Sequence, residues 1–151
     1  MGFEKLNVTY QRADLDILKQ MLALFAEVFD DLNSYQSKIA SDAYLESRLK
    51  DDTLIALAAI VDGRVVGALA AYVLKKFEQE RSEIYIYDLG VLEDRRRRGI
   101  ATGLINRTRE IAKEIGAWVV YVQADAGDDP AIKLYESLGT REDVHHFDII
   151  P

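Results

Sequence analysis

The sequence contains no cysteine and only two prolines, and its formal net charge is -7. The absence of cysteine excludes disulfides, thiolate metal sites and a cysteine nucleophile. The negative charge argues against general nucleic-acid binding and favours a cationic partner. The longest apolar run, 54–61, is too short to cross a bilayer, and the N-terminal segment MGFEKLNVTY lacks the pattern of a secretion signal. We therefore expect a cytoplasmic protein with no nucleic-acid partner and no membrane partner.

The composition is that of an ordinary globular chain. Of the 151 residues, 49% are hydrophobic and 30% are charged, and we find no internal repeat, low-complexity segment or linker. This length is close to the common size of one domain. The sequence therefore predicts a single domain over residues 1–151.

Periodicity in the first part of the chain predicts two helices followed by three strands. Apolar residues at helical spacing predict a helix over 14–29 with Asp14 as its N-cap, and a shorter helix over 41–50. The segment TLIALAAIVDGRVVGALAAYVL predicts two strands joined by a hairpin turn at Asp62-Gly63. A third strand is predicted over 84–91.

The second part of the chain predicts alternating helices and strands. A helix is expected over 100–115, ended by Gly116, followed by an apolar strand over 117–124 with both faces covered. The next helix has Asp129 as its expected N-cap, Pro130 at its first position and Gly139 after its end. The tail REDVHHFDII is expected to form a last strand. The predicted fold class is therefore mixed α/β, with a central mixed sheet flanked by helices.

The segment RRRRGIATGL, residues 95–104, joins the third strand to the following helix. A strand, a short loop, a glycine and a helix N-terminus form an arrangement that binds phosphate, because the first backbone N–H groups of a helix have no partners within it. The segment contains no GxxxxGK[ST] and no GxGxxG pattern, so a Walker-type or dinucleotide loop is unsupported. From spacing alone, a solvated basic turn remains the alternative. A nucleic-acid patch fits poorly, because aromatic neighbours are absent and the rest of the chain is acidic.

Two motifs resemble those of one enzyme superfamily. RRRGIA, residues 96–101, matches the pattern Gln/Arg-x-x-Gly-x-Gly/Ala and resembles the acetyl-CoA pyrophosphate loop of the GNAT N-acetyltransferases. AIKLYESLG, residues 131–139, is similar to the second signature helix of that superfamily, and the order of elements agrees over about residues 5–149. YIYDLGV and YVQADAGDDPAIKLYESLGTREDVHHFDI resemble the aminoglycoside 3-N-acetyltransferases, the gentamicin-acetylating branch. The resemblance implies the GNAT fold, acetyl-CoA as cosubstrate, acetylation of the 3-amino group of a gentamicin-type aminoglycoside, and antibiotic resistance.

The resemblance also implies which residues bind acetyl-CoA. The backbone of Leu89 and Val91 would pair with the pantetheine arm, and the N–H of Val91 would polarise the acetyl carbonyl. Apolar strand residues such as these are usually core, so the side chains alone do not show this. Around the phosphates, the implied residues are Arg96, Arg97, Arg98, Gly99, Ile100, Ala101 and Thr102, with Arg95 the least suited of the four arginines.

Two residues are candidates for proton transfer. Asp88 lies in an otherwise apolar and aromatic strand, so either an arginine pairs with it or it faces a hydrated cleft, where it would bind an ammonium group and act as general base. Tyr135 matches the superfamily tyrosine that protonates the leaving thiolate. The alternative for Tyr135 is a core tyrosine on a helix.

Substrate recognition is expected near the C-terminal end, where acidic residues gather. Runs of acids are usually solvated, but carboxylates around a cleft would hold a polycationic aminoglycoside. Tyrosines would stack on the sugar rings, although strand tyrosines are more often core. The candidates, in order, are Asp125, Asp148, Glu142 and Asp143, with Tyr87, Tyr121 and His146. Adjacent His145 and His146 in a strand point to opposite faces, so we expect no metal.

Two other functions are alternatives to aminoglycoside acetylation. The first is acetylation of a different small amine by the same fold, such as a polyamine or a peptide N-terminus. A non-catalytic acetyl-CoA-binding scaffold is a third class, which the phosphate loop together with Asp88 and Tyr135 argues against. Because the superfamily often forms dimers, we expect a homodimer. A direct transfer without an acyl-enzyme is expected, since the chain has no thiol.

Overall fold

The computed structural model describes residues 7–31, 35 and 38–151 and divides the chain into two compact units, one ending at Tyr121 and one spanning Val122–Pro151. Each unit is described here by itself; the prediction of a single domain stays a prediction. The elements are, in chain order, β1 (Thr9–Arg12), α1 (Leu15–Val28), α3 (Asp42–Lys50), β2 (Leu54–Val61), β3 (Arg64–Lys75), β4 (Ser82–Val91), a 3-10 turn (Glu93–Arg95), α4 (Ile100–Ile115), β5 (Ala117–Val122) and α5 (Asp129–Leu138).

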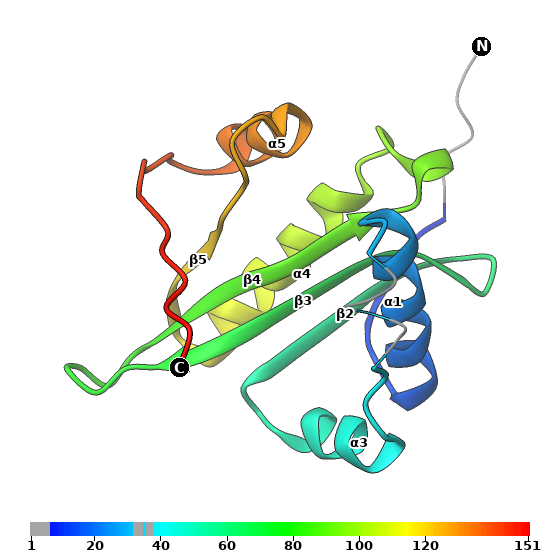
Figure 1. The fold of residues 1–151 in the computed structure, drawn as a ribbon, viewed down its shortest axis with the longest axis horizontal. Coiled ribbons are helices and arrows are strands. Elements are labelled where there is room, and N and C mark those ends of the chain that lie inside the picture. Colours follow the sequence, from blue (N-terminus) through cyan, green and yellow to red (C-terminus); the bar gives the residue numbers. More distant parts are fainter. Residues whose placement is uncertain (1–6, 32–34, 36–37) are drawn as a thin grey trace. The chain divides into compact units, whose positions relative to one another are not determined.

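The strands form one sheet in the order β1-β2-β3-β4-β5, with antiparallel pairing from β1 to β4 (Figure 1). The β2–β3 hairpin turns at Asp62 and Gly63, whose φ angles of 49° and 76° are those of a type I′ turn. Helix α4 connects β4 to β5, so β5 runs parallel to β4. The predicted mixed sheet is therefore confirmed.

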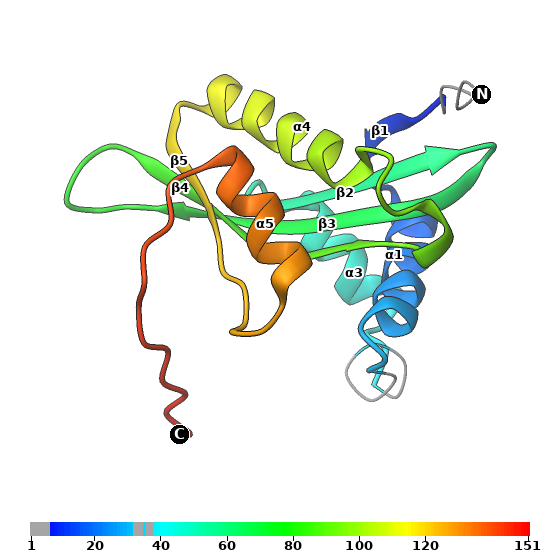
Figure 2. The ribbon, with the colours of Figure 1, turned by 90° about the horizontal axis from the view of Figure 1, so that it is seen from above.

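Helices cover both faces of the sheet in the first unit. Helix α4 packs on one face, and α1 with α3 on the other (Figure 2). Two glycines permit this close packing. A Cβ at Gly67 on β3 would lie 2.8 Å from Cγ2 of Ile100 on α4, and a Cβ at Gly90 on β4 would lie 3.1 Å from Cγ1 of Val28 on α1. The two faces of the sheet can therefore be named the α4 face and the α1 face.

Local sequence signals set the helix ends. The Asp14 carboxylate accepts from Ile17 N at 2.8 Å, which confirms the predicted N-cap of α1. Ser41, predicted only as the start of the second helix, is its N-cap, and its Oγ accepts from Tyr44 N at 3.2 Å. Gly116 ends α4 with a φ of 74°. The apolar face of α4 is buried as predicted except at its last residue, since Ile115 is 46% exposed.

One strand was missed, and three predictions are wrong. The short edge strand β1 was not expected, and the tail after Gly139 contains no strand. Helix α5 is capped by Asp128, whose carboxylate accepts from Ala131 N at 3.4 Å, so Asp129 is already helical and is not the N-cap. Strand β5 is half-exposed rather than covered on both faces, because it ends the sheet.

No helix in the described part of the chain is long and apolar enough to cross a membrane.

Candidate active site

A β-bulge in β4 sets the direction of the Asp88 side chain. Asp88 pairs with Ala70 on β3 whereas Ile86 pairs with the next residue, Ala71, so Tyr87 is an extra residue in β4. Ile86 therefore stays on the α4 face, where it is 2% exposed. Past the bulge, Asp88 is turned to the α1 face, the same face as Gly90.

The Asp88 carboxylate is half-buried and has one hydrogen bond from a phenol. The hydroxyl of Tyr35, which follows α1, donates to Asp88 Oδ1 at 2.8 Å. Burial raises the pKa of Asp88 above its usual value, and the hydrogen bond from Tyr35 opposes this by stabilising the carboxylate. The sequence left open an arginine partner or a hydrated cleft. The partner found, Tyr35, is an uncharged phenol, so its hydrogen bond does not neutralise the carboxylate as an arginine would.

Four tyrosines from three strands contact one another through their rings and are named the tyrosine cluster: Tyr72, Tyr85, Tyr87 and Tyr121. Tyr72 links the cluster to Asp88, because it lies near enough for the carboxylate to raise the Tyr72 pKa. Tyr85 stacks on Tyr121 with ring centroids 4.7 Å apart, and Tyr87 lies edge-on to both Tyr72 and Tyr85, at 6.0 and 5.6 Å. Tyr87 is 66% exposed. Desolvation raises the pKa of Tyr72, Tyr85 and Tyr121, so these phenols stay neutral at physiological pH. The cluster offers flat ring surfaces beside one carboxylate.

The arginine segment forms a backbone cradle at the start of α4. Arg97 and Gly99 both adopt left-handed backbone, with φ of 61° and 78°. For an arginine this conformation costs roughly 1–2 kcal/mol, so the loop is held in it by its surroundings. Gly99 is the N-cap of α4 and contributes no side-chain cap, which leaves the first-turn N–H groups of the helix facing outward. A Cβ on Gly99 would meet nothing within 4 Å, so the space beside the N-cap is open.

Arginine side chains hold and flank this cradle. Arg96 Nε donates to the carbonyl oxygen of Val91 at 3.1 Å, which fixes the loop to the end of β4. Arg97 and Arg98 are exposed. The cradle therefore has the positive helix end, the open approach and the free guanidinium groups that a pyrophosphate needs. The predicted residues Ala101 and Thr102 lie in the first turn of α4, while Ile100 is buried against Gly67 and contributes only its backbone.

Asp88 and the cradle belong to the same end of β4. Asp88 precedes Val91 by three residues, which corresponds to about 10 Å along a strand. Leu89, between them, points to the α4 face because it pairs with Leu69. Asp88 therefore lies near the residue whose carbonyl oxygen Arg96 holds, at the end of β4 that leads into the cradle.

The other predicted residues belong to the second unit. Tyr135 lies on α5 and is half-buried, and burial raises the pKa of its hydroxyl, with Asp128 adding to the effect. Asp125 and Glu142 are exposed. Asp143 is already paired, since Arg141 Nε donates to its carboxylate at 2.8 Å. His146 Nε2 and Asp148 Oδ1 are 2.9 Å apart in the exposed tail.

No metal centre is formed by the described residues, because none of them gather in a group of three histidines or acids able to hold an ion. The alternation argument for His145 and His146 relied on a strand that the tail does not form. The adjacent rings still diverge in their contacts: His145 lies 6.4 Å from the Phe147 ring, and His146 contacts Asp148.

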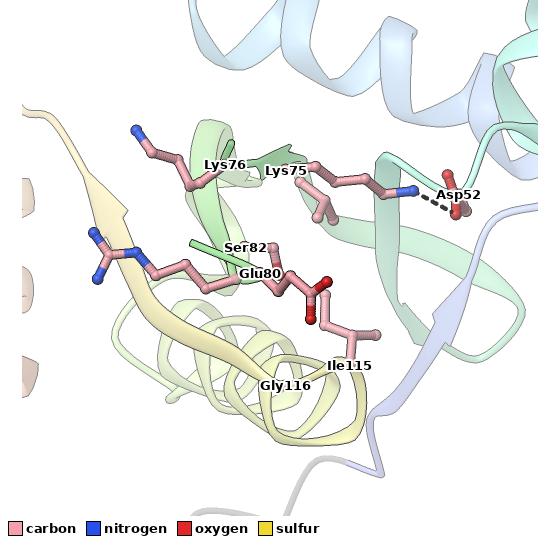
Figure 3. A pocket seen from close by; sticks show the side chains of 9 residues that line it. Asp52, Lys75, Lys76, Glu80, Ser82, Ile115 and Gly116 are labelled. Carbon is pink, nitrogen blue, oxygen red and sulfur yellow. Dashed lines mark hydrogen bonds and ion pairs between the residues drawn. The ribbon is translucent and has the colours of Figure 1, made fainter. Parts of the chain in front are cut away.

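A hollow of 460 Å³ lies elsewhere, where β3, β4 and α4 meet at Lys75, Ser82 and Gly116 (Figure 3). Gly116 ends the 16-residue helix α4, so the hollow is about 24 Å from the cradle. Its charges are largely paired: Lys75 Nζ is 2.9 Å from Asp52, and Arg81 lies over the Trp118 ring at 4.3 Å. We assign no chemistry to it.

Three residues of this site were missed by sequence analysis. Tyr85 was within reach, because it alternates with Tyr87 on β4. Tyr72 required the register of the β3–β4 hairpin, which places it opposite Tyr85. Tyr35 had no signal, because its contact with Asp88 spans 53 positions of sequence.

Comparisons with known proteins agree on one family. The model of the Acetyltransferase (GNAT) family matches residues 19–140. An aminoglycoside acetyltransferase from an uncultured soil metagenomic sample has a solved structure that superposes with a TM-score of 0.94 at 47% identity, covering 97% of this chain and 99% of that one. A second, solved in complex with sisomicin and also from an uncultured soil metagenomic sample, gives 0.89 at 32% identity, covering 95% and 96%.

A relative of a different kind is the N-alpha-acetyltransferase of Sulfurisphaera tokodaii, which is 31% identical over 110 residues. The alignment covers 66% of this chain and 64% of the relative. The chain thus matches less than two thirds of the length of that protein.

Proposed function

Because the chain belongs to the GNAT acetyltransferase family, we propose that it transfers the acetyl group of acetyl-CoA to the 3-amino group of a gentamicin-type aminoglycoside and thereby confers resistance. The observation that carries the proposal is the half-buried Asp88 carboxylate beside the tyrosine cluster, at the same end of β4 as the cradle. The 47% identity with a soil aminoglycoside acetyltransferase over nearly the whole chain supports this substrate class.

Acetyl-CoA supplies the activated acetyl group. In the proposed complex, the N–H groups of residues 98–102 would bind its pyrophosphate together with Arg96 and Arg97, and the backbone of Leu89 and Val91 would hold the pantetheine arm. The proposed role of Val91 N–H is to polarise the acetyl carbonyl. Its carbonyl oxygen is bound by Arg96, which would keep the end of β4 in place.

Asp88 would act on the substrate amine. An ammonium ion is not a nucleophile, so one proton must leave before the nitrogen attacks the acetyl carbonyl. Asp88 attracts the ammonium group and takes its proton, directly or through water. The raised pKa of this carboxyl brings it closer to that of the amine than an exposed aspartate would be. The nitrogen loses its second proton to water as the amide forms. Tyr135, neutral at physiological pH, would donate a proton to the departing thiolate and regain one from solvent.

The tyrosine cluster would bind the sugar rings. Tyr87 and Tyr121 have the flat apolar surfaces that stack on sugar faces, and the remaining ammonium groups would be held by Asp125 and Asp148, then Glu142, Asp143 and His146. A second candidate substrate is a peptide N-terminus or another small amine. The observation that favours it is the similarity to the N-alpha-acetyltransferase of Sulfurisphaera tokodaii.

The test is a panel of amines with acetyl-CoA: gentamicin, sisomicin, spermidine and a peptide with a free N-terminus. Released CoA is followed with a thiol reagent, without protein background, and NMR locates the acetylated nitrogen. We expect gentamicin to be acetylated on its 3-amino group with sequential kinetics. Turnover of only spermidine or the peptide would contradict the substrate, and ping-pong kinetics would contradict direct transfer.

Asp88→Asn tests the base. It should lower kcat/KM by about 100-fold or more, a typical size for a lost general base. Asp62→Asn is the matched control, because Asp62 lies in the β2–β3 turn and asparagine tolerates its positive φ. Near-normal turnover by Asp88→Asn would remove Asp88 from the mechanism.

A further inference from the structure

The hydrogen bond from Tyr35 to Asp88 is held in place by aromatic packing. The Tyr35 ring lies 5.8 Å from Phe25 and 5.8 Å from Phe29, tilted against both, and the two phenylalanine rings stack on each other at 5.5 Å. Phe25 is 2% exposed, so this aromatic group is anchored in the core. The ring of Tyr35 is therefore held in a fixed orientation from which its hydroxyl meets Asp88.

The approach of α1 to β4 brings the two residues together. Gly90, two residues beyond Asp88, allows this approach, because a Cβ there would press on Val28 and contact Phe25 at 3.6 Å. The bulge at Tyr87 supplies the other half of the geometry by turning Asp88 toward α1. Two separate features of the fold thus converge on one hydrogen bond.

We propose that Tyr35 is a positioning residue for Asp88: its hydroxyl holds the carboxylate oriented and ionised for the substrate amine and does not itself contact the reacting atoms. The inference rests on the proposed role of Asp88 as the base. A charge-assisted O–H···O bond at 2.8 Å fixes one carboxylate oxygen and leaves the other for the amine.

Burial and the Tyr35 hydroxyl have opposite effects on the pKa of Asp88. Burial favours the protonated acid, which cannot accept a proton, and Tyr35 stabilises the carboxylate against it. Among the described residues, Tyr72 from β3 also interacts electrostatically with Asp88, and Tyr87 from β4 acts on Tyr35. Asp31 lies near Tyr35, and Arg48 and Tyr44 act on Tyr72. The pKa of Tyr35 itself is raised far above its usual range, first by burial and then by Asp88, so the phenol remains a donor at every working pH.

Tyr35→Phe removes the hydroxyl and keeps the ring that packs on Phe25 and Phe29. The Asp88 pKa should then rise by about one to two pH units, the effect of losing a hydrogen bond to a charged group. A base must be unprotonated to act, so the acidic limb of the kcat/KM profile should move to higher pH by the same amount. Above that limb, kcat/KM should stay within a few-fold of the unmodified enzyme.

An NMR titration separates a positioning role of Tyr35 from a purely structural one. The Asp88 carboxyl is titrated by carbon-13 NMR in the free protein, its signal assigned by its absence in Asp88→Asn. Tyr72→Phe is the control, because Tyr72 interacts with Asp88 only through space, and its loss should leave the Asp88 titration in place. An unshifted titration in Tyr35→Phe would overturn the proposal.

A double variant tests whether Tyr35 acts through Asp88. Tyr35→Phe should lower kcat/KM at pH 6 in the unmodified enzyme and have no further effect in the Asp88→Asn background. Equal losses in both backgrounds would overturn the proposal. If Asp88→Asn keeps normal turnover, the base assignment fails, whereas the NMR titration still decides whether Tyr35 controls the ionisation of Asp88.

Discussion

Gly67→Ala should destabilise the protein and weaken acetyl-CoA binding together. Gly67 is the position on β3 where α4 begins its contact with the sheet. A Cβ there would lie 2.8 Å from Cγ2 of Ile100 and 3.4 Å from both Cβ of Ala59 and Cδ1 of Leu104. Ile100 is 2% exposed and Leu104 is fully buried, so neither side chain can swing into solvent. The first turn of α4 must therefore move away from the sheet.

The expected magnitude follows from this overlap. Carbon atoms pack best at about 3.5–4.0 Å, so Ile100 must retreat by roughly 0.7 Å or more. Overpacking of this kind costs about 1–3 kcal/mol, and alanine regains about 0.5–1 kcal/mol over glycine in a strand. The net loss is about 1–2 kcal/mol of unfolding free energy, or about 2–8 °C in Tm for a chain of this size. Since the same turn forms the cradle, KM for acetyl-CoA should rise several-fold with little change in kcat.

Denaturant unfolding and steady-state kinetics measure both effects. Gly139→Ala is the matched control, because its Cβ would make only an ordinary contact at 3.8 Å, and its unfolding free energy should change by less than about 0.5 kcal/mol. Ile100→Leu removes the Cγ2 methyl, so the double variant with Gly67→Ala should lose less stability than the sum of the single variants. An unchanged unfolding free energy for Gly67→Ala, or strict additivity, would refute this account of α4 packing.

Two further predictions concern the proposed chemistry. Gly99→Ala should cost about 1 kcal/mol of stability because its φ is 78°, and calorimetry should show about ten-fold weaker acetyl-CoA binding. Gly63→Ala is the control, because this position is equally open and has a φ of 76°. It should cost the same stability and leave the acetyl-CoA affinity unchanged. Equal acetyl-CoA affinities in the two variants would show that the cradle does not bind acetyl-CoA. Tyr135→Phe should lower kcat about ten-fold with KM unchanged, because water can still protonate a good leaving group; unchanged kcat with lower stability would assign Tyr135 to packing.

Local signals in the sequence were enough for most elements of the first unit. Asp14 and Ser41 predicted helix starts because a side-chain oxygen and a nearby backbone N–H are sufficient to form a cap. The Asp62-Gly63 turn was predicted because few residue pairs tolerate two positive φ angles. The start of α4 was predicted from the spacing of its apolar residues and the glycine before them, and the structure adds that Gly99 adopts left-handed backbone. Each of these features is decided within about four residues.

Features that depend on distant partners were missed. Strand β1 exists because Thr9–Arg12 pairs with the edge of β2, and its sequence TYQR has too few apolar residues to indicate this. The apolar residues of the tail predicted a strand, but Phe147 and Ile149 are 80% and 89% exposed. An alternating pattern forms a strand only where a neighbouring strand can pair with it, and the sequence alone did not show whether one was present. The capping of α5 by Asp128 was missed because Asp129 is chemically equivalent.

The direction of Asp88 shows most clearly where sequence reasoning stops. Simple alternation along IYIYDLGV would place Asp88 on the face of Ile84 and Ile86, the buried α4 face, where an ionised carboxylate would be costly. The insertion of Tyr87 as a bulge reverses that alternation, so Asp88 reaches the α1 face and Tyr35 while Tyr87 stays exposed beside it. One extra residue in the β3–β4 register thus determines whether the aspartate is a defect in the core or a candidate base. Nothing in the strand sequence itself specifies the bulge, because its pairing depends on β3.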